Sequence, residues 1–446
     1  MPAMPSIVPA AMAATAISRT SGASTPTPPT AAAPSLEGGR TATVDGRSDA
    51  GAGAVSADGA VRWDVILAST LTSAVLSRHP PNDGRTGTFG GGDLHSLHVR
   101  TTLAPLMKLA HVRDRHGPAG DPWRLVAALG VGTPTRWLDL ETARRRAIAA
   151  EPRLAHNSVL HRRPLTTLDD VFEAGLRVEA VRDLVDGFSP RGEEDDAVVE
   201  HENLVYGPPI LRPPSLRDFY AFERHVRTMW ERRGGEVPEA WYGLPIFYFS
   251  NVSEVRGPDD PVWSPAASTE LDYELEVAAL VDTPVVDLPP ERGDEAIGGY
   301  TIFNDWSARD LQREETTVRL GPAKGKDFAS SFGPWLVTPD ELATSRAPAK
   351  GPDVLMTAEV NGVETSRGRW SDARFSFAEM VARASADARL RPGDLLGSGT
   401  VGTGCLLEVG EETLGRYLRP GDEVVLRVEG LGALRTPIVA RPAARR

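Results

Sequence analysis

Apolar and polar residues alternate most regularly in the second half of the chain. In residues 271–277, apolar side chains at every second position alternate with Glu274 and Glu276, and this period of two predicts a β-strand. The two carboxylates therefore project from one face of the strand, roughly 6–7 Å apart along it. A second apolar strand is predicted at residues 300–304, and Asp305, which ends it, can close the same site.

Carboxylates held this close repel each other unless a cation lies between them. A cluster that offers only oxygen atoms suits a hard cation such as Mg²⁺, Ca²⁺ or Mn²⁺, and it does not suit zinc or copper. The spacing alone leaves an alternative open, in which Glu274 and Glu276 lie on the solvent-exposed face of an amphipathic strand.

The surrounding pattern predicts one helix and then many strands. Ser215 followed by Asp218 is typical of a helix N-terminus, and residues 234–235, both glycine, supply the stop. Two Leu-Arg-Pro-Gly-Asp segments, at 390–394 and 418–422, favour type II turns. Strands without regular helical crossovers indicate an antiparallel or mixed β-roll and not a doubly wound sheet.

The first half of the chain gives more mixed signals and divides into two parts. Strands are predicted at 107–112, 123–129 and 136–140, helices at 141–149 and 176–185, and an acidic connector at 189–196. We therefore expect an α+β protein with three parts: a low-complexity, disordered extension at 1–106 with one short helix near 63–76, a small N-terminal α+β domain at 107–204, and a mixed β-roll domain at 205–446. Met107 is the expected start of the folded protein.

Composition narrows the range of partners. A net charge of −12 and a pI near 5.4 argue against nucleic acid or an anionic membrane as a partner. No apolar run is long enough to span a membrane, and the opening residues lack the basic segment of a secretory signal. The single cysteine, Cys405, has no partner for an internal disulfide, which fits the cytoplasm, and we expect it to be a small core residue.

Lysine and histidine are distributed unevenly. Four of the 49 basic residues are lysines, and two of them lie at 324 and 326. A compact ammonium approaches a single oxygen end-on, which a planar guanidinium does not, so this pair favours a chemical role. Of the nine histidines only His225 lies beyond His201, which makes it the one candidate for a histidine base in the second half.

Several segments combine into one pattern. They are Asp218-Phe219-Tyr220 with His225, residues 271–276, 304–312 and 320–328, and residues 398–400 with Glu408. In this order and spacing they resemble the fumarylacetoacetate hydrolase family over about residues 205–440. The resemblance implies a β-roll catalytic domain, a small N-terminal domain and a homodimer.

The resemblance also implies individual roles. The family's metal ligands are matched by Asp218, Glu274, Glu276 and Asp305. Its catalytic base is similar to His225, and the carboxylate that orients the base is similar to Glu408. Its oxyanion donors are matched by Arg309, Gln312 and Lys326, and its substrate contacts by Tyr220, Tyr248 and Thr400. Periodicity indicates three of the four ligands, whereas Asp218 comes from the resemblance alone. On the expected helix, His225 follows Asp218 by seven residues and so lies on nearly the same face.

The implied activity is metal-dependent cleavage of a C–C bond in a β-diketo acid by water. The substrate would be fumarylacetoacetate, from aromatic amino acid catabolism, or a related acylpyruvate, and the cofactor Mg²⁺ or Ca²⁺, with Mn²⁺ also compatible. Histidine supplies a base of near-neutral pKa, the oxyanion donors stabilise the negative charge on the attacked carbonyl, and the divalent ion holds the leaving enolate.

The sequence also departs from the family pattern. Thr316 stands where the diketo-acid hydrolase of tyrosine breakdown has a tyrosine, residues 249–251 differ, and no substrate-binding arginine after His225 can be assigned. Other chemistry on the same scaffold therefore stays open: oxaloacetate decarboxylation, dienedioate isomerisation or sugar-acid dehydration. A metal-stabilised binding protein without turnover is the alternative from a different class.

Overall fold

The computed structural model describes residues 107–118, 120–192, 195–347, 350–410 and 412–443. The helix expected near residues 63–76 and the extension at 1–106 lie outside the described residues. The described helices are α1 (Leu140–Ala150), α2 (Leu154–Asn157), α3 (Val159–Arg162), α4 (Leu168–Glu173), α5 (Arg182–Asp186), α6 (Glu223–Arg232), α7 (Arg309–Thr316), α8 (Phe377–Ser385) and α9 (Leu406–Val409), with 3₁₀ turns η1 (Val178–Val181), η2 (His201–Asn203), η3 (Glu239–Gly243), η4 (Pro290–Ala296), η5 (Pro339–Ser345) and η6 (Trp370–Asp372).

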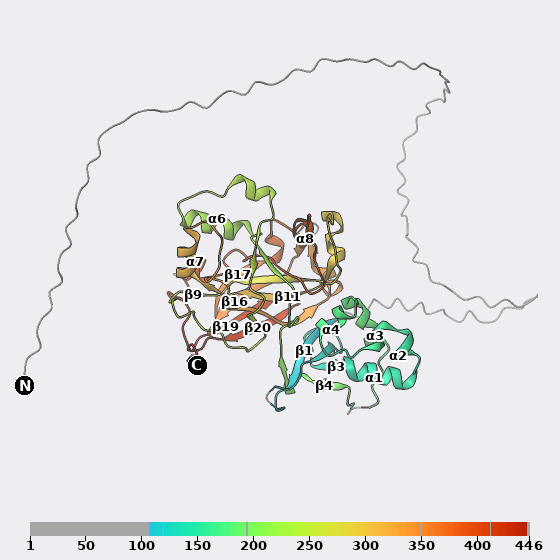
Figure 1. Ribbon diagram of the computed structural model, residues 1–446. Coiled ribbons are helices and arrows are strands. Elements are labelled where there is room, and N and C mark those ends of the chain that lie inside the picture. Colours follow the sequence, from blue (N-terminus) through green and yellow to red (C-terminus); the bar gives the residue numbers. More distant parts are fainter. Residues whose placement is uncertain (1–106, 119, 193–194, 348–349, 411, 444–446) are drawn as a thin grey trace, which may run out of the picture. The chain divides into compact units, whose positions relative to one another are not determined.

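Strands make up most of the regular structure beyond residue 200. They are β1 (Lys108–Asp114), β2 (Arg124–Ala128), β3 (Arg136–Asp139), β4 (Val198–Glu200), β5 (Leu204–Tyr206), β6 (Leu216–Phe219), β7 (Phe247–Ser250), β8 (Val255–Arg256), β9 (Leu271–Asp272), β10 (Leu275–Val281), β11 (Ile297–Asp305), β12 (Ser307–Ala308), β13 (Ser330–Val337), β14 (Arg346–Ala347), β15 (Gly351–Pro352), β16 (Leu355–Val360), β17 (Val363–Arg369), β18 (Leu395–Gly397), β19 (Glu423–Val428) and β20 (Gly432–Pro437). Figure 1 shows α1–α4 beside β1, β3 and β4.

The main sheet has twelve strands and runs from the N-terminal segment into the C-terminal one. Its order is β4-β3-β2-β1-β13-β11-β10-β18-β6-β7, with β5 paired to β1 and β8 to β13. A second sheet has the order β17-β16-β19-β20. Most pairs are antiparallel, but β18–β6 and β13–β8 are parallel. The arrangement confirms the expected α+β class with a mixed, sheet-rich C-terminal region.

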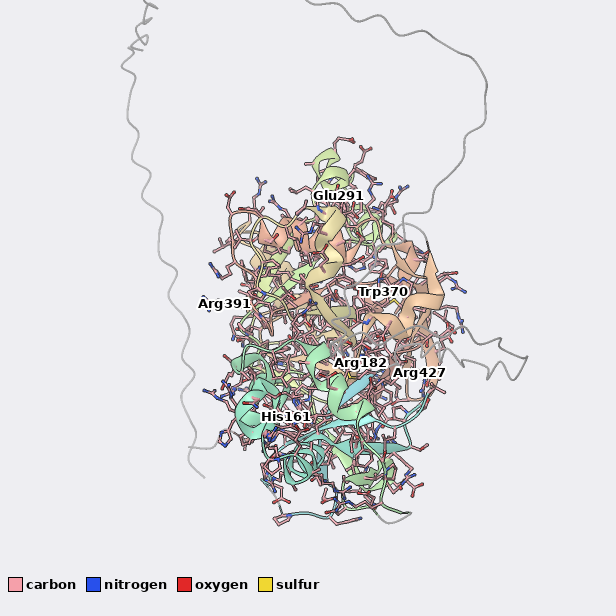
Figure 2. The ribbon with its side chains drawn as sticks, turned by 90° about the vertical axis from the view of Figure 1, so that its right-hand side faces the viewer. His161, Arg182, Glu291, Trp370, Arg391 and Arg427 are labelled. Carbon is pink, nitrogen blue, oxygen red and sulfur yellow. The ribbon has the colours of Figure 1, made fainter. Side chains whose placement is uncertain are left out.

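Apolar packing also joins the two segments. One hydrophobic cluster combines Leu109 and Leu125 of β1 and β2 with Phe303 and Phe332 of β11 and β13. The rings of Phe303 and Phe332 stack with centroids 4.6 Å apart. The buried Arg182 of α5 donates to Asp340 over 3.1 Å, and Figure 2 shows Arg182 where the N-terminal helices meet the C-terminal strands. No helix of the described residues is long and apolar enough to cross a membrane.

The helix expected to start at Ser215 is wrong at its beginning. Residues Leu216–Phe219 form β6, all four of them buried, paired in parallel with β18 and antiparallel with β7. Ser215 donates its hydroxyl to Asp394 instead of capping a helix. The helix α6 begins only at Glu223, so Asp218 and His225 do not share a helix face. Its expected stop is confirmed, since Gly234 has a φ of +72° just after α6.

Other local expectations are mostly confirmed. The expected strand at 271–277 is divided between β9 and β10, and the expected helix at 176–185 is a 3₁₀ turn, η1, followed by the short α5. Both Pro-Gly turns form as expected: Gly393 and Gly421 have φ of +92° and +97°. Each turn closes with a backbone hydrogen bond, from Asp394 to Arg391 over 3.0 Å and from Asp422 to Arg419 over 3.1 Å.

Candidate active site

Four carboxylates converge where neighbouring strands of the main sheet end. Asp218 comes from β6, Glu274 from the link between β9 and β10, Glu276 from β10 and Asp305 from the end of β11. Ladder pairing sets their separation, because β11, β10, β18 and β6 are consecutive in the sheet. One oxygen from each of the four carboxylates lies within 4.8 Å of the others. The structure thus brings together all four residues that the resemblance identified as ligands.

The cluster is buried, so the solvent-exposed reading of this strand is wrong. Glu274 is 5% exposed and Glu276 and Asp305 are 0% exposed. Burial, together with the neighbouring carboxylates, raises the pKa of Asp218 and of Glu276 well above the usual range. One oxygen of Asp218 and one of Asp305, both Oδ1, have no hydrogen-bond partner among the described residues. Orphaned oxygens in an all-carboxylate set fit a hard divalent cation.

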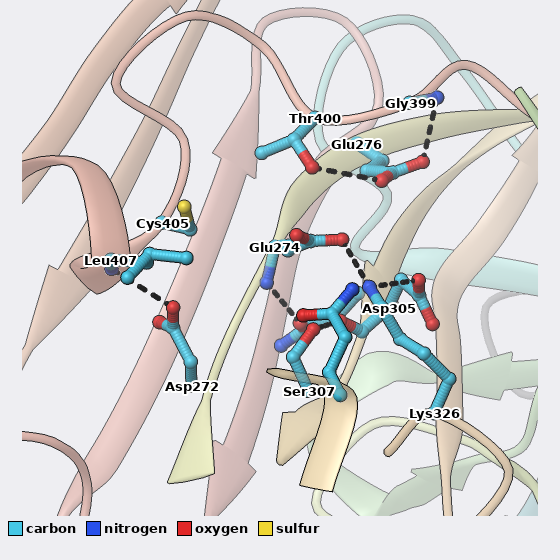
Figure 3. A network of polar contacts seen from close by, with 12 residues as sticks. Asp272, Glu274, Glu276, Asp305, Ser307, Lys326, Gly399, Thr400, Cys405 and Leu407 are labelled. Atoms are coloured by element: carbon cyan, nitrogen blue, oxygen red, sulfur yellow. Dashed lines mark hydrogen bonds and ion pairs between the residues drawn. The ribbon is translucent and has the colours of Figure 1, made fainter. Parts of the chain in front are cut away.

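Lys326 lies against the same cluster. Its Nζ is 2.5 Å from Oε2 of Glu274 and 2.5 Å from Oδ2 of Asp305, as Figure 3 shows. Burial alone would lower the pKa of this ammonium, but the charges of Asp305 and Glu274 outweigh it and raise the pKa. In turn Lys326 and Arg309 hold the pKa of Glu274 below its ordinary value despite its burial. The ammonium therefore balances part of the negative charge and leaves Asp218 and Glu276 unmatched.

His225 and Glu408 form a buried pair beside the carboxylates. Nδ1 of His225, in α6, lies 2.9 Å from Oε2 of Glu408, in α9, and both side chains are less than 5% exposed. The distance is that of a hydrogen bond, yet the ring nitrogen is not aligned for one, and it has no other partner among the described residues. Tyr220 contacts the imidazole edge-on, with ring centroids 5.5 Å apart. The histidine and the carboxylate that the resemblance implies as base and orienting group are therefore brought together from two separate helices.

Arg309 connects several parts of the site. Its guanidinium lies 2.8 Å from Asp272 and 2.8 Å from Oε1 of Glu274, and it donates to the side-chain oxygen of Gln312 over 3.0 Å. Because this bond uses the carbonyl oxygen of Gln312, the amide nitrogen of that residue remains able to donate to a ligand. Burial favours neutralisation of the guanidinium, but Glu274 and Asp272 raise the pKa of Arg309 well above its ordinary value.

Asp272 is a site residue that sequence reasoning missed. It is 0% exposed, and besides Arg309 it accepts hydrogen bonds from the backbone N–H groups of Leu406 and Leu407 at 2.8 and 3.0 Å. These amides begin α9, the helix that carries Glu408. Asp272 lies within the same 271–276 segment that was singled out for its glutamates, but nothing local shows that its donors lie elsewhere in the chain.

The expected substrate contacts are partly engaged with the carboxylates. The hydroxyl of Tyr248 donates to Asp305 over 2.6 Å, and that of Thr400 donates to Glu276 over 3.3 Å. The backbone N–H of Gly399 donates to the other oxygen of Glu276 over 2.9 Å. Burial and the charge of Asp305 raise the pKa of Tyr248 well above its usual range, so its hydroxyl stays protonated and able to donate.

These groups open into one cavity of about 350 Å³. Ten of the twelve expected site residues line it; Asp305 and Glu408 lie behind the lining. The lining residues that sequence reasoning did not assign include the apolar Met229, Phe247 and Leu407, and also Arg233. Arg233 follows the end of α6 and is exposed at the cavity, and its guanidinium has no ion-pair partner among the described residues. No sequence signal separates it from the neighbouring Arg232, which donates to the backbone oxygen of Glu408.

Comparison with known proteins agrees with this fold. Residues 215–439, half of the chain, match the sequence model of the fumarylacetoacetate hydrolase C-terminal domain, and the chain therefore belongs to the fumarylacetoacetate hydrolase family. Family members of this kind are enzymes, and of the two relatives described next one is named a fumarylacetoacetase and the other a hydrolase.

Two curated relatives and one solved structure illustrate the likeness. The chain is 32% identical over 271 residues to fumarylacetoacetase of Oryza sativa subsp. japonica, covering 47% of this chain and 62% of that protein. It is 31% identical over 195 residues to 2,4-didehydro-3-deoxy-L-rhamnonate hydrolase of Sphingomonas sp., covering 44% and 65%. Both alignments thus span less than two thirds of the relative. The structure of fumarylacetoacetate hydrolase from Exiguobacterium antarcticum aligns over 75% of this chain and 100% of its own, with a TM-score of 0.52 and 24% identity, which supports the shared fold.

Proposed function

We propose that this protein is a metal-dependent hydrolase that cleaves a C–C bond in a β-diketo acid, either fumarylacetoacetate or a related acylpyruvate. The observation that carries the proposal is the buried His225–Glu408 pair, which adjoins the same cavity as the four-carboxylate cluster. The relatives add support, because the names of both hydrolases describe acids with carbonyl groups in a 1,3 relation.

Different residues on the cavity wall perform different steps of the hydrolysis. With Nδ1 turned to Glu408, His225 presents its other ring nitrogen to the cavity, where it takes a proton from water. The water oxygen forms a bond to the attacked carbonyl carbon. Lys326, Gln312 and Arg309 stabilise the negative charge that develops on the carbonyl oxygen, and Arg309 also holds Gln312 in place.

The C–C bond then breaks, and its electron pair passes to the methylene carbon. The imidazolium returns its proton to this carbon, so that one water is consumed and two acids are released. Asp218, Glu274, Glu276 and Asp305 would hold the divalent cation, which supplies a Lewis acid for the enolate when bound. The all-oxygen donor set indicates a hard cation, and Mg²⁺, Ca²⁺ and Mn²⁺ all meet that requirement.

The test is product analysis with purified protein, magnesium and either fumarylacetoacetate or a simple acylpyruvate. We expect release of the two acids by the wild type, and no release by His225→Ala or after chelation. His156→Ala, a change at an exposed histidine of α2, serves as the matched control and keeps full activity. Intact diketo acid in every sample would refute the hydrolase, and oxaloacetate and a dienedioate would then be assayed for the alternative reactions on this scaffold.

As part of the same proposal, the enzyme acts as a homodimer in the cytoplasm. The buried state of Cys405, the one cysteine of the chain, supports a fold that needs no disulfide. Light scattering coupled to gel filtration measures the mass directly, and a monomer at micromolar concentration would contradict the dimer.

A further inference from the structure

A second group of metal-ligating side chains lies behind the base. His225, Cys405 and Glu408 each offer one ligand atom, and these three atoms lie within 4.8 Å of one another. The group shares no residue with the four-carboxylate cluster. Its donor set is also different, since it combines a ring nitrogen, a sulfur and one carboxylate oxygen.

The separations are close to those that a tetrahedral cation requires. Nδ1 of His225 lies 2.9 Å from Oε2 of Glu408, and Sγ of Cys405 lies 3.7 Å from the same oxygen. Zinc bonds of about 2.0–2.3 Å place neighbouring tetrahedral ligands roughly 3.3–3.7 Å apart. The 2.9 Å separation of Nδ1 and Oε2 would therefore have to open by about 0.4 Å to admit the ion.

An unsatisfied nitrogen points to a ligand at this place. His225 is 3% exposed, and its Nδ1 has no hydrogen-bond partner among the described residues although it faces Glu408. A buried polar atom left in this state costs free energy, which a bound cation would recover. His225 and Leu407 line the cavity, so an ion that enters the cavity reaches the edge of the group.

We propose that His225, Cys405 and Glu408 form a second metal site, specific for zinc or a similar borderline cation, and that its occupation inhibits the enzyme. Thiolate and imidazole ligands favour zinc, whereas magnesium prefers the four carboxylates. Coordination of Nδ1 makes the imidazole a poorer proton acceptor and takes Glu408 away from its orienting role. Binding converts the Cys405 thiol to a thiolate, and the released proton passes to the solvent.

Cobalt is the probe for the site, because a cobalt–thiolate bond absorbs in the near ultraviolet and oxygen ligands do not. The protein is titrated with Co²⁺ in saturating magnesium, which occupies the carboxylate cluster. We expect one equivalent of the band in the wild type, none in Cys405→Ser, and an undiminished band in Glu276→Gln, which lacks a complete carboxylate cluster. Since Cys405 is the only cysteine of the chain, no other thiolate can produce the signal.

Inhibition is measured in parallel. We expect micromolar zinc to suppress turnover of the wild type at saturating magnesium by at least tenfold, and to leave Cys405→Ser, whose activity without zinc is unchanged, essentially uninhibited. Cys405→Ala provides a second variant should the serine be poorly tolerated in this buried position. Absence of the cobalt band in the folded wild type would overturn the site, and equal zinc inhibition of wild type and Cys405→Ser would overturn its inhibitory role. The absorbance needs no turnover, so it stands whether or not the proposed hydrolase reaction is found.

Discussion

Replacement of Asp272 by asparagine is the sharpest test of how the site is held together. The carboxylate accepts hydrogen bonds from Arg309 at 2.8 Å and from the first two amides of α9 at 2.8 and 3.0 Å. Burial raises the pKa of Asp272, yet every group that faces its oxygens is a donor, so the ionised form is the one that its surroundings stabilise. Asparagine has nearly the same shape, but its NH₂ group would oppose one of these donors.

The expected cost follows from these contacts. Breaking a buried ion pair by removing one partner typically costs about 3–5 kcal/mol of unfolding free energy. Arg309 keeps a second carboxylate, Glu274, at 2.8 Å, so we expect the lower end, about 3 kcal/mol. Because α9 carries Glu408 and Arg309 holds Gln312, both the proposed base and a proposed oxyanion donor lose their support. We expect kcat to fall about 10²-fold, similar to the loss of one oxyanion donor, with little change in KM.

Urea unfolding and steady-state kinetics on the diketo acid measure the two effects separately. The matched control is Asp310→Asn, at the residue that follows Arg309. Its carboxylate also accepts several hydrogen bonds, from Ser268, Thr269 and Leu311, but none from Arg309 or from the amides of α9. The control should lose about 1 kcal/mol of stability and no kcat. If Asp272→Asn is destabilised while its kcat stays at the wild-type value, Asp272 is a structural residue only and the reasoning is refuted.

Four further outcomes are expected. Glu276→Gln should abolish the stabilisation by magnesium, which for the wild type reaches about 2.7 kcal/mol at a magnesium concentration a hundred times the dissociation constant. Calorimetry measures this stabilisation, and equal rises in melting temperature of both proteins on adding magnesium would contradict the prediction. Without divalent ions, the unfolding free energy should fall as pH rises above the ordinary carboxyl range. The reason is that the raised pKa values of Asp218 and Glu276 make the folded form bind more protons than the unfolded form. An unfolding free energy from urea titration that does not change with pH would contradict this. Lys326→Met should lower kcat by about 10²–10³-fold, and Lys324→Met, at an exposed lysine, should not. Arg233→Ala should raise KM for a carboxylate substrate by about tenfold with kcat retained, since charged hydrogen bonds contribute about 1.5–3 kcal/mol, and an unchanged KM would exclude the contact.

Most of the carboxylate cluster can be predicted from the sequence, because three of its four residues lie in segments whose local pattern indicates a strand. Period-two alternation identifies Glu274 and Glu276, and the end of an apolar strand identifies Asp305. Asp218 could not be found in this way. Ser215 and Asp218 together match a helix N-terminus, whereas the pairing of Asp218 with Gly397 on β18, remote in the sequence, makes the segment a strand. Long-range sheet pairing here overrides local propensity.

The role of Asp272 also could not be predicted from local sequence patterns. Its role depends on donors at Arg309 and at the start of α9, 37 and more than 130 residues further along the chain. Periodicity reports which face of a strand a residue occupies and cannot report which donors meet it there. The same holds for Arg233, whose place at the cavity depends on where α6 ends and how it packs.

Charge balance explains why this site contains a lysine in a chain that otherwise relies on arginine. Arg309 lies against Asp272 and Glu274 as a planar group with several donors, whereas Lys326 places one small ammonium 2.5 Å from both Glu274 and Asp305. A guanidinium has no compact point charge to place there. Even so, two cations face five buried carboxylates when Asp272 is counted with the cluster, which leaves three negative charges without a partner. Burial of that surplus is strongly unfavourable unless protons or a divalent ion compensate it, so the proposed metal affinity and the raised pKa values of Asp218 and Glu276 have one common cause.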